Sequence, residues 1–101
     1  MKTKRAKATD ISMRVKRIVW ERDKNRCVLC ENRNAMPNAH YISRAQGGLG
    51  IEENIITLCN TCHFKYDNTI QRPIIKKLLK SYLSSHYDNW DEKKLTYKKW
   101  R

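Results

Sequence analysis

Two C-x2-C motifs, separated by 28 residues, constrain the fold of this 101-residue chain more than any other feature. Each motif can form a tight turn that directs two thiolates toward one point. Two such turns complete the closed tetrahedral site typical of structural zinc. Disulfide bonds are the alternative, but the basic N-terminal residues are followed by no apolar segment of the kind found in secretory signals. We therefore expect a cytoplasmic protein with structural Zn²⁺ bound by Cys27, Cys30, Cys59 and Cys62.

The charge of the chain is strongly basic and unevenly distributed. Lys and Arg number 22 against 10 Asp and Glu, for a formal net charge of +12. Residues 1–26 carry +7 and residues 64–101 carry +6, whereas residues 27–63 carry −1. This distribution favours a polyanion partner, with DNA as the leading candidate and a merely basic protein as the alternative. No apolar run approaches the roughly 20 residues that span a bilayer, so we expect no membrane partner.

Hydrophobic spacing predicts a small α+β domain. Apolar residues at helical spacing indicate an amphipathic helix from Ile11 to Asp23, with Asp10 or Ser12 as its N-cap. The three glycines gather in the loop 46–50, which therefore needs positive φ or a close backbone approach. The other expected elements are strands over 35–43 and 55–58, a helix over 61–67, and a helix starting near Pro73 with an apolar stripe of Ile74, Ile75, Leu78, Leu79, Tyr82 and Leu83.

These elements divide the chain into three parts. Residues 1–10 are basic and lack periodic apolar residues, so they are expected to form a disordered arm. The domain spans 11–87. Residues 88–101 form a basic tail in which Trp90, Tyr97 and Trp100 alternate with lysines. These aromatic side chains either stack on nucleic acid bases or pack back on the domain.

The segment AHYISRAQGGLGIEENIITLCNTCH, residues 39–63, closely resembles the HNH nucleases. Several independent parts agree: a histidine, a Gly-Gly loop, Glu-Asn before a β-branched strand, and L-C-x-x-C-H. The resemblance covers 27–67 well and extends weakly to the preceding helix, which is similar to small phage-borne members. It implies a ββα-metal fold with a zinc knuckle pair and flanking helices. The implied activity is that of a metal-dependent DNA endonuclease, which nicks or cuts with weak sequence preference in phage packaging or mobile elements.

By position in the family motif, the resemblance implies catalytic roles for three residues. His40 would be the general base that takes a proton from water as it attacks phosphorus. Asn54 would hold the hairpin loop and fix the His40 ring through hydrogen bonds. His63 would bind a divalent cation, Mg²⁺ or Mn²⁺ with Ni²⁺ as a further candidate. That cation would stabilise the charge on the phosphate and on the departing 3′ oxygen.

The chain departs from the family pattern at Ala39. The family usually places a second metal ligand, Asp or His, immediately before the general base, and alanine offers no ligand atom. Asp67 lies one helical turn after His63, so both side chains can face one ion, and we predict Asp67 as the second ligand. The alternative is a zinc-ribbon DNA-binding module that keeps the fold with little or no cleavage.

The basic flanks supply candidate phosphate contacts that are independent of DNA sequence. Arg44 precedes the glycine loop and could also reach a phosphate. A phage terminase or another specificity partner is a candidate second partner, and the protein is expected to be a monomer or weak dimer. The candidate DNA contacts are Lys16, Arg17, Arg22, Arg44, Lys76, Lys77 and Lys80.

Overall fold

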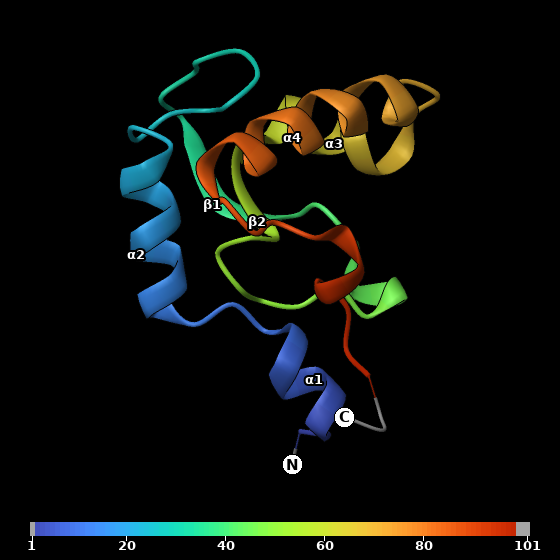
Figure 1. Ribbon diagram of the computed structural model, residues 1–101. Helices are drawn as coiled ribbons and strands as arrows, with labels where there is room; N and C mark the ends of the chain where they lie inside the picture. Colours follow the sequence, from blue (N-terminus) through green and yellow to red (C-terminus); the bar gives the residue numbers. More distant parts are fainter. Residues whose placement is uncertain (1, 99–101) are drawn as a thin grey trace.

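The computed structural model describes residues 2–98 as a mixed fold of short helices around a two-stranded antiparallel sheet (Figure 1). Figure 1 shows α2 on one side of the sheet, and α3 with α4 on the other. Within the described residues, no helix is long and apolar enough to cross a membrane. The elements are α1 (Lys4–Thr9), α2 (Met13–Arg22), β1 (Ala35–His40), η1 (Arg44–Gln46), β2 (Ile55–Cys59), α3 (Asn60–Asn68), α4 (Arg72–His86) and η2 (Glu92–Lys94).

The sheet and α3 determine which side chains of the motif come together. In the antiparallel register, Ala35 lies opposite Cys59 and His40 lies opposite Ile55. The second C-x2-C motif and His40 therefore belong to opposite ends of the sheet. Helix α3 begins directly after β2, and its later residues lie near the His40 end, since the Tyr66 hydroxyl donates a hydrogen bond of 2.6 Å to the Tyr41 carbonyl.

Local sequence explains where the helices begin. The Ser12 side chain accepts a hydrogen bond from the Val15 N–H, so Ser12 is the N-cap of α2. The Cys59 sulfur caps α3 in the same way, by accepting from the Cys62 N–H. Pro73 occupies the first turn of α4, where its missing N–H costs no hydrogen bond.

The core lies on both faces of the sheet. Val15 and Val19 of α2 pack against Ile55, and α4 buries residues spaced four apart, Ile75, Leu79 and Leu83. The predicted apolar stripe of α4 is therefore too wide. Ile74 and Leu78 are exposed because they lie on the adjacent face of the helix, which points away from the sheet.

The prediction of a disordered arm over residues 1–10 is wrong for the described residues, since 4–9 form α1. Thr3 caps this helix, and the Arg5 guanidinium donates hydrogen bonds to the carbonyls of Arg44 and Ala45. The Ala8 carbonyl accepts a hydrogen bond from the Gly50 N–H. The partners of Arg5 lie 39 and 40 residues away along the chain, so local hydrophobic pattern carries no sign of them.

The segment after α4 packs back on the domain as far as it is described. Trp90 lies edge-on to Tyr41, with ring centroids 5.7 Å apart, and its indole N–H donates to the Glu53 carbonyl. Leu95 is buried, and Thr96 forms a β-bridge with Gly48. Packing thus accounts for Trp90, while Trp100 lies outside the described residues.

Candidate functional site

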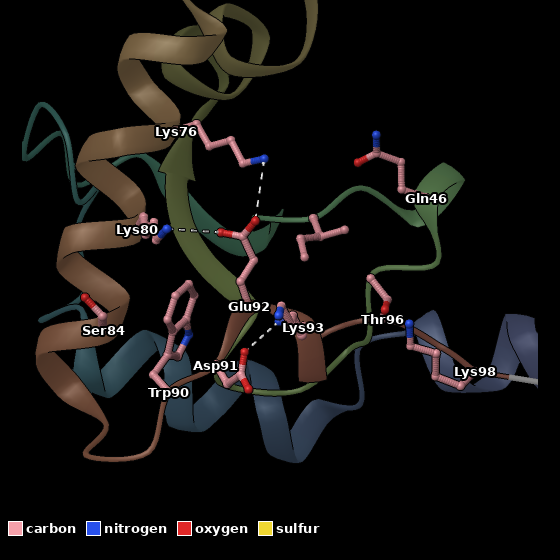
Figure 2. Close-up of a pocket in the computed structure, with 11 residues that line it drawn as sticks. Gln46, Lys76, Lys80, Ser84, Trp90, Asp91, Glu92, Lys93, Thr96 and Lys98 are labelled. Atoms are coloured by element: carbon pink, nitrogen blue, oxygen red, sulfur yellow. Dashed lines mark hydrogen bonds and ion pairs between the residues drawn. The ribbon is translucent and has the colours of Figure 1, made fainter. Parts of the chain in front are cut away.

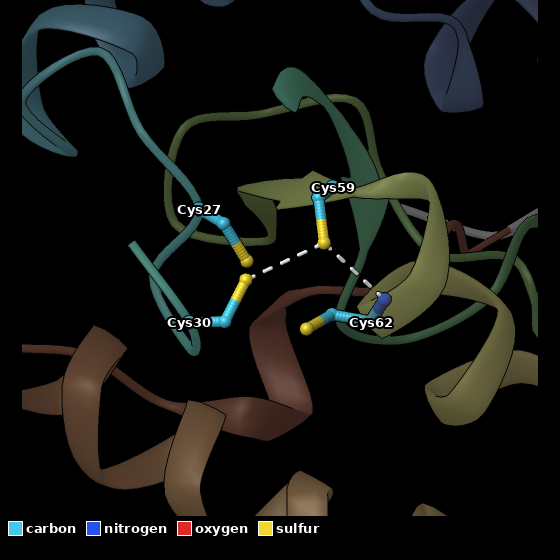
Figure 3. A group of neighbouring side chains, drawn as sticks. All are labelled: Cys27, Cys30, Cys59 and Cys62. Carbon is cyan, nitrogen blue, oxygen red and sulfur yellow. Dashed lines mark hydrogen bonds between the residues drawn. The ribbon is translucent and has the colours of Figure 1, made fainter. Parts of the chain in front are cut away.

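The four cysteines converge on one point, as Figure 3 shows. Their Sγ atoms all lie within 4.8 Å of one another, and those of Cys30 and Cys59 are 3.5 Å apart. Metal–sulfur bonds of about 2.3 Å in a tetrahedron place sulfurs about 3.8 Å apart, so the cluster has the dimensions of a metal site. All four thiols are free of disulfide bonds. The cluster can therefore bind a structural metal such as zinc.

The pKa values of the Cys59 and Cys62 thiols differ from the ordinary value for cysteine. Burial raises the pKa of the Cys59 thiol, but hydrogen bonds from the Cys62 N–H and from the neighbouring thiols outweigh it and lower that pKa to about 7. Burial, together with the neighbouring sulfurs, raises the pKa of Cys62. A divalent metal would displace the thiol protons and neutralise the negative charge of the resulting thiolates.

A buried ion pair holds the first C-x2-C motif against the sheet. The Arg22 guanidinium has five N–H donors, and all five are used: two on Asp23, and one each on the Glu52 carbonyl, the Ile55 carbonyl and the Tyr87 hydroxyl. Its side chain is only 9% exposed. The prediction that Arg22 contacts DNA is therefore wrong, because no donor remains for a phosphate.

His40 lies at the end of β1 with 8% of its surface exposed. Its Nε2 atom is 2.8 Å from the Thr9 carbonyl oxygen. Because a carbonyl only accepts hydrogen bonds, this contact assigns the proton to Nε2 and leaves a lone pair on Nδ1. Burial lowers the pKa of His40, Arg44 and His63 act in the same direction, and the Thr9 hydrogen bond opposes them. The ring is thus arranged as a neutral proton acceptor.

Helix α3 places Asp67 near His40. His40 and Asp67 line one cavity of about 400 Å³, together with Arg44 and Arg72. The His63 Nε2 atom lies 2.9 Å from the Asp67 carboxylate, one helical turn away. Among residues 2–98, the four cysteines form the only group of three or more side chains close enough to bind one metal ion, and His63 and Asp67 form a pair. A cation on His63 and Asp67 would therefore need water or substrate to complete its ligand shell.

Asn54 has a structural role in the loop between the strands. Its side-chain oxygen accepts from the Ile42 N–H, and its amide donates to the carbonyls of Ile42 and Leu49. Asn54 thus holds the loop as predicted, but the predicted hydrogen bond to the His40 ring is wrong, since the ring bonds to Thr9 instead. Gly48 is required in this loop because a Cβ there would lie 1.6 Å from the Ile42 carbonyl oxygen.

The basic residues predicted to contact DNA have different surroundings. Lys76 and Lys80 border a second groove of about 840 Å³, and each approaches the Glu92 carboxylate at 3.9 Å (Figure 2). Gln46 lines both this groove and the His40 cavity, so the two are neighbours across the loop. Arg17 and Lys77 are exposed on α2 and α4, and Lys16 is half-buried.

Sequence reasoning missed three residues of the His40 cavity and its rim. Arg72 stacks on the Tyr66 ring at 4.3 Å and lies 3.7 Å from Asp67. The Asp10 carboxylate pairs with Arg44 at 2.7 Å, and Thr9 contributes its backbone carbonyl. A basic residue just before Pro73 is a weak signal for Arg72, whereas a backbone carbonyl has no signature in sequence.

Comparison of the chain with protein families, curated proteins and solved structures finds no match. The fold and the cysteine cluster define a small α+β protein with a candidate four-cysteine metal centre.

Proposed function

We propose that this chain is a metal-dependent DNA endonuclease of the HNH type, which hydrolyses phosphodiester bonds. The observation that carries the proposal is the cavity shared by His40 and Asp67, with His63 paired to Asp67 at its side. An imidazole with a lowered pKa can act as general base, a His–Asp pair can hold a cation, and arginines can bind phosphate oxygens, so these groups together suit phosphodiester hydrolysis. The order of strand, strand and helix agrees with the resemblance of residues 39–63 to that family.

The chain's own groups divide the work as follows. The Nδ1 lone pair of His40 accepts a proton from the attacking water. Arg44 and Arg72, which both line the cavity, bind phosphate oxygens. His63 and Asp67 would hold Mg²⁺ or Mn²⁺, which when bound supplies positive charge to the phosphate and the leaving oxygen. Imidazole with a carboxylate suits these ions.

Structural zinc in the four-cysteine cluster would hold the first knuckle to the end of β2. Cys59 lies at the opposite end of the sheet from His40, whereas Cys62 directly precedes His63 in α3, so the zinc would also fix the start of the helix that carries His63 and Asp67. The two metals then have separate roles, one in folding and one in cleavage.

Incubation of supercoiled plasmid with the zinc-loaded protein tests the proposal. We expect Mg²⁺, Mn²⁺ or Ni²⁺ to produce nicked or linear DNA, and His40→Ala to abolish cleavage while DNA binding persists. His86→Ala is the matched control, because His86 is exposed at the end of α4 and its ring contacts the Ser85 hydroxyl and the Tyr82 carbonyl of the same helix. Full cleavage by His40→Ala contradicts the assignment.

A second candidate function is a DNA-binding module without cleavage. It is favoured by Ala39, which is fully buried and offers no ligand where the nucleases that the motif resembles usually have one. DNA binding by the wild type without cleavage under any of the three ions supports this alternative over the nuclease.

A further inference from the structure

The end of α1 directs two consecutive backbone carbonyls at the candidate active site and its loop. The Thr9 carbonyl bonds the His40 ring at 2.8 Å, and the Ala8 carbonyl accepts the Gly50 N–H at 2.9 Å. Thr9 is 4% exposed, so its contact with the ring is shielded from water. A segment expected to be disordered thus supplies the hydrogen-bond partner of the candidate base.

Further contacts hold this segment in place. The Asp10 carboxylate pairs with Arg44 and with Lys2, and these hydrogen bonds lower the pKa of Asp10. The Arg5 guanidinium reaches two carbonyls of η1, at 2.8 and 3.2 Å. A Cβ at Gly50 would lie 1.9 Å from the Asp10 carbonyl oxygen, so the two backbones meet at a distance that only glycine permits.

We infer that the segment Ala8–Asp10 positions His40, because the Thr9 carbonyl holds the ring of this cavity-lining residue as its Nε2–H tautomer and so leaves Nδ1 as the proton acceptor. This inference rests on the proposed function for the role of His40 as base, but the tautomer itself can be measured without any reaction. Thr9 is a positioning residue and acts through its backbone. Its own hydroxyl bonds within α1, to the Ala6 carbonyl, so the side chain is not needed for the contact with His40.

Without this contact the His40 ring would lose its fixed orientation. Neutral imidazole carries its proton on either nitrogen, and only the Nε2–H form leaves Nδ1 free to accept. The structure places Asn54, the other candidate partner, on Ile42 and Leu49. The Thr9 carbonyl of the N-terminal segment therefore makes the hydrogen bond that orients the His40 ring, a role that the sequence motif assigns to Asn54.

The test separates the carbonyl of Thr9 from its side chain. Gly50→Ala should displace the segment, because the three atoms nearest to the added Cβ all belong to Asp10 and Ile11. Thr9→Val keeps the carbonyl and is the matched control. Arg5→Ala combined with Asp10→Ala loosens the segment without introducing a clash, which covers the case in which Gly50→Ala fails to fold. Zinc content and cooperative melting establish that each variant is folded.

The primary measurement is ¹⁵N NMR of the His40 ring in the full-length, zinc-loaded protein. We expect a protonated Nε2 and an unprotonated Nδ1 in the wild type and in Thr9→Val. In the two docking variants, Gly50→Ala and the Arg5/Asp10 double variant, we expect the shifts to move toward a mixture of tautomers. Their kcat for plasmid nicking should be lower by at least about tenfold, with KM nearly unchanged in Gly50→Ala, which keeps the pairing of Asp10 with Arg44.

The outcomes distinguish the two proposals. Unchanged His40 shifts and unchanged kcat in both docking variants would overturn the positioning role of Thr9. A wild-type protein with the Nε2–H tautomer that cleaves no DNA would contradict the proposed nuclease function and leave the structural assignment of His40 intact.

Discussion

The Asp23 carboxylate accepts a hydrogen bond of 2.9 Å from the Thr57 N–H, which joins the end of α2 to the middle of β2. The same carboxylate accepts the Tyr82 hydroxyl from α4 and the Arg22 guanidinium. One buried acid thus ties together three elements just before the first cysteine knuckle. Its position explains how a small core holds Cys27 opposite the cysteines at the end of β2.

Removal of the Arg22 charge should be strongly destabilising. In Arg22→Met, the buried Asp23 carboxylate loses its counter-ion, so the free energy of unfolding should fall by about 3–5 kcal/mol. Urea denaturation of the zinc-loaded protein measures this change. Arg17→Gln is the control on the exposed face of α2 and should change stability by less than about 0.5 kcal/mol. Equal stability of the two variants would contradict the structural role of Arg22.

Removal of the metal should unfold the protein. Structural zinc in small sites contributes on the order of 10–16 kcal/mol, which is as large as the whole net stability of a typical small domain, about 5–15 kcal/mol. We expect chelation to abolish the cooperative thermal transition followed by circular dichroism, and added Zn²⁺ to restore it. A fully metal-free protein that still melts cooperatively would show that the four-cysteine cluster is dispensable for folding.

The nicking rate should depend on pH through His40. Burial lowers its pKa from 6.5, so the neutral, proton-accepting ring is present above pH 6.5 and is lost as the pH falls through the lowered value. A pH profile of kcat/KM should therefore show an acidic limb with its midpoint below 6.5. Because the unfolded chain binds this proton more readily, His40 also makes the fold less stable as the pH falls below 6.5.

The positive charge of Arg44 contributes to the lowered pKa of His40. Arg44→Gln should therefore raise the pKa of His40 toward 6.5, as followed by an NMR titration of the ring. Arg33→Gln is the control, since Arg33 is exposed in the loop before β1. A His40 pKa that stays the same in both variants would contradict the electrostatic coupling.

DNA affinity should depend on the exposed lysines of α4. Each phosphate that the protein no longer neutralises makes the slope of log K against log salt shallower by about 0.9. Lys77→Gln should weaken binding of a duplex oligonucleotide and reduce this slope, whereas the nicking rate at saturating DNA should be unchanged. If Lys77→Gln and Arg33→Gln bind with the same slope, α4 is not part of the DNA surface.

Local spacing is enough to predict several features of this protein. The sequence alone predicts the convergence of the four cysteines, the helices around Val15 and Tyr66, and the close backbone approach of the glycine loop. Each of these depends on residues near one another in the chain, or on a metal-site spacing that restricts the fold strongly. The pairing of His63 with Asp67 is of the same kind, because one helical turn separates them.

Only the tertiary structure decided the features that depend on distant partners. Arg22 is positively charged, as a DNA contact would be, but its N–H groups donate to the carbonyls of Glu52 and Ile55 instead. The N-terminal residues have the composition of a disordered arm, yet Thr9 reaches His40 through a backbone atom that every residue possesses. Side-chain type and spacing determine local structure and candidate chemistry. Which groups are buried against which carbonyls is determined by the packing of the whole chain.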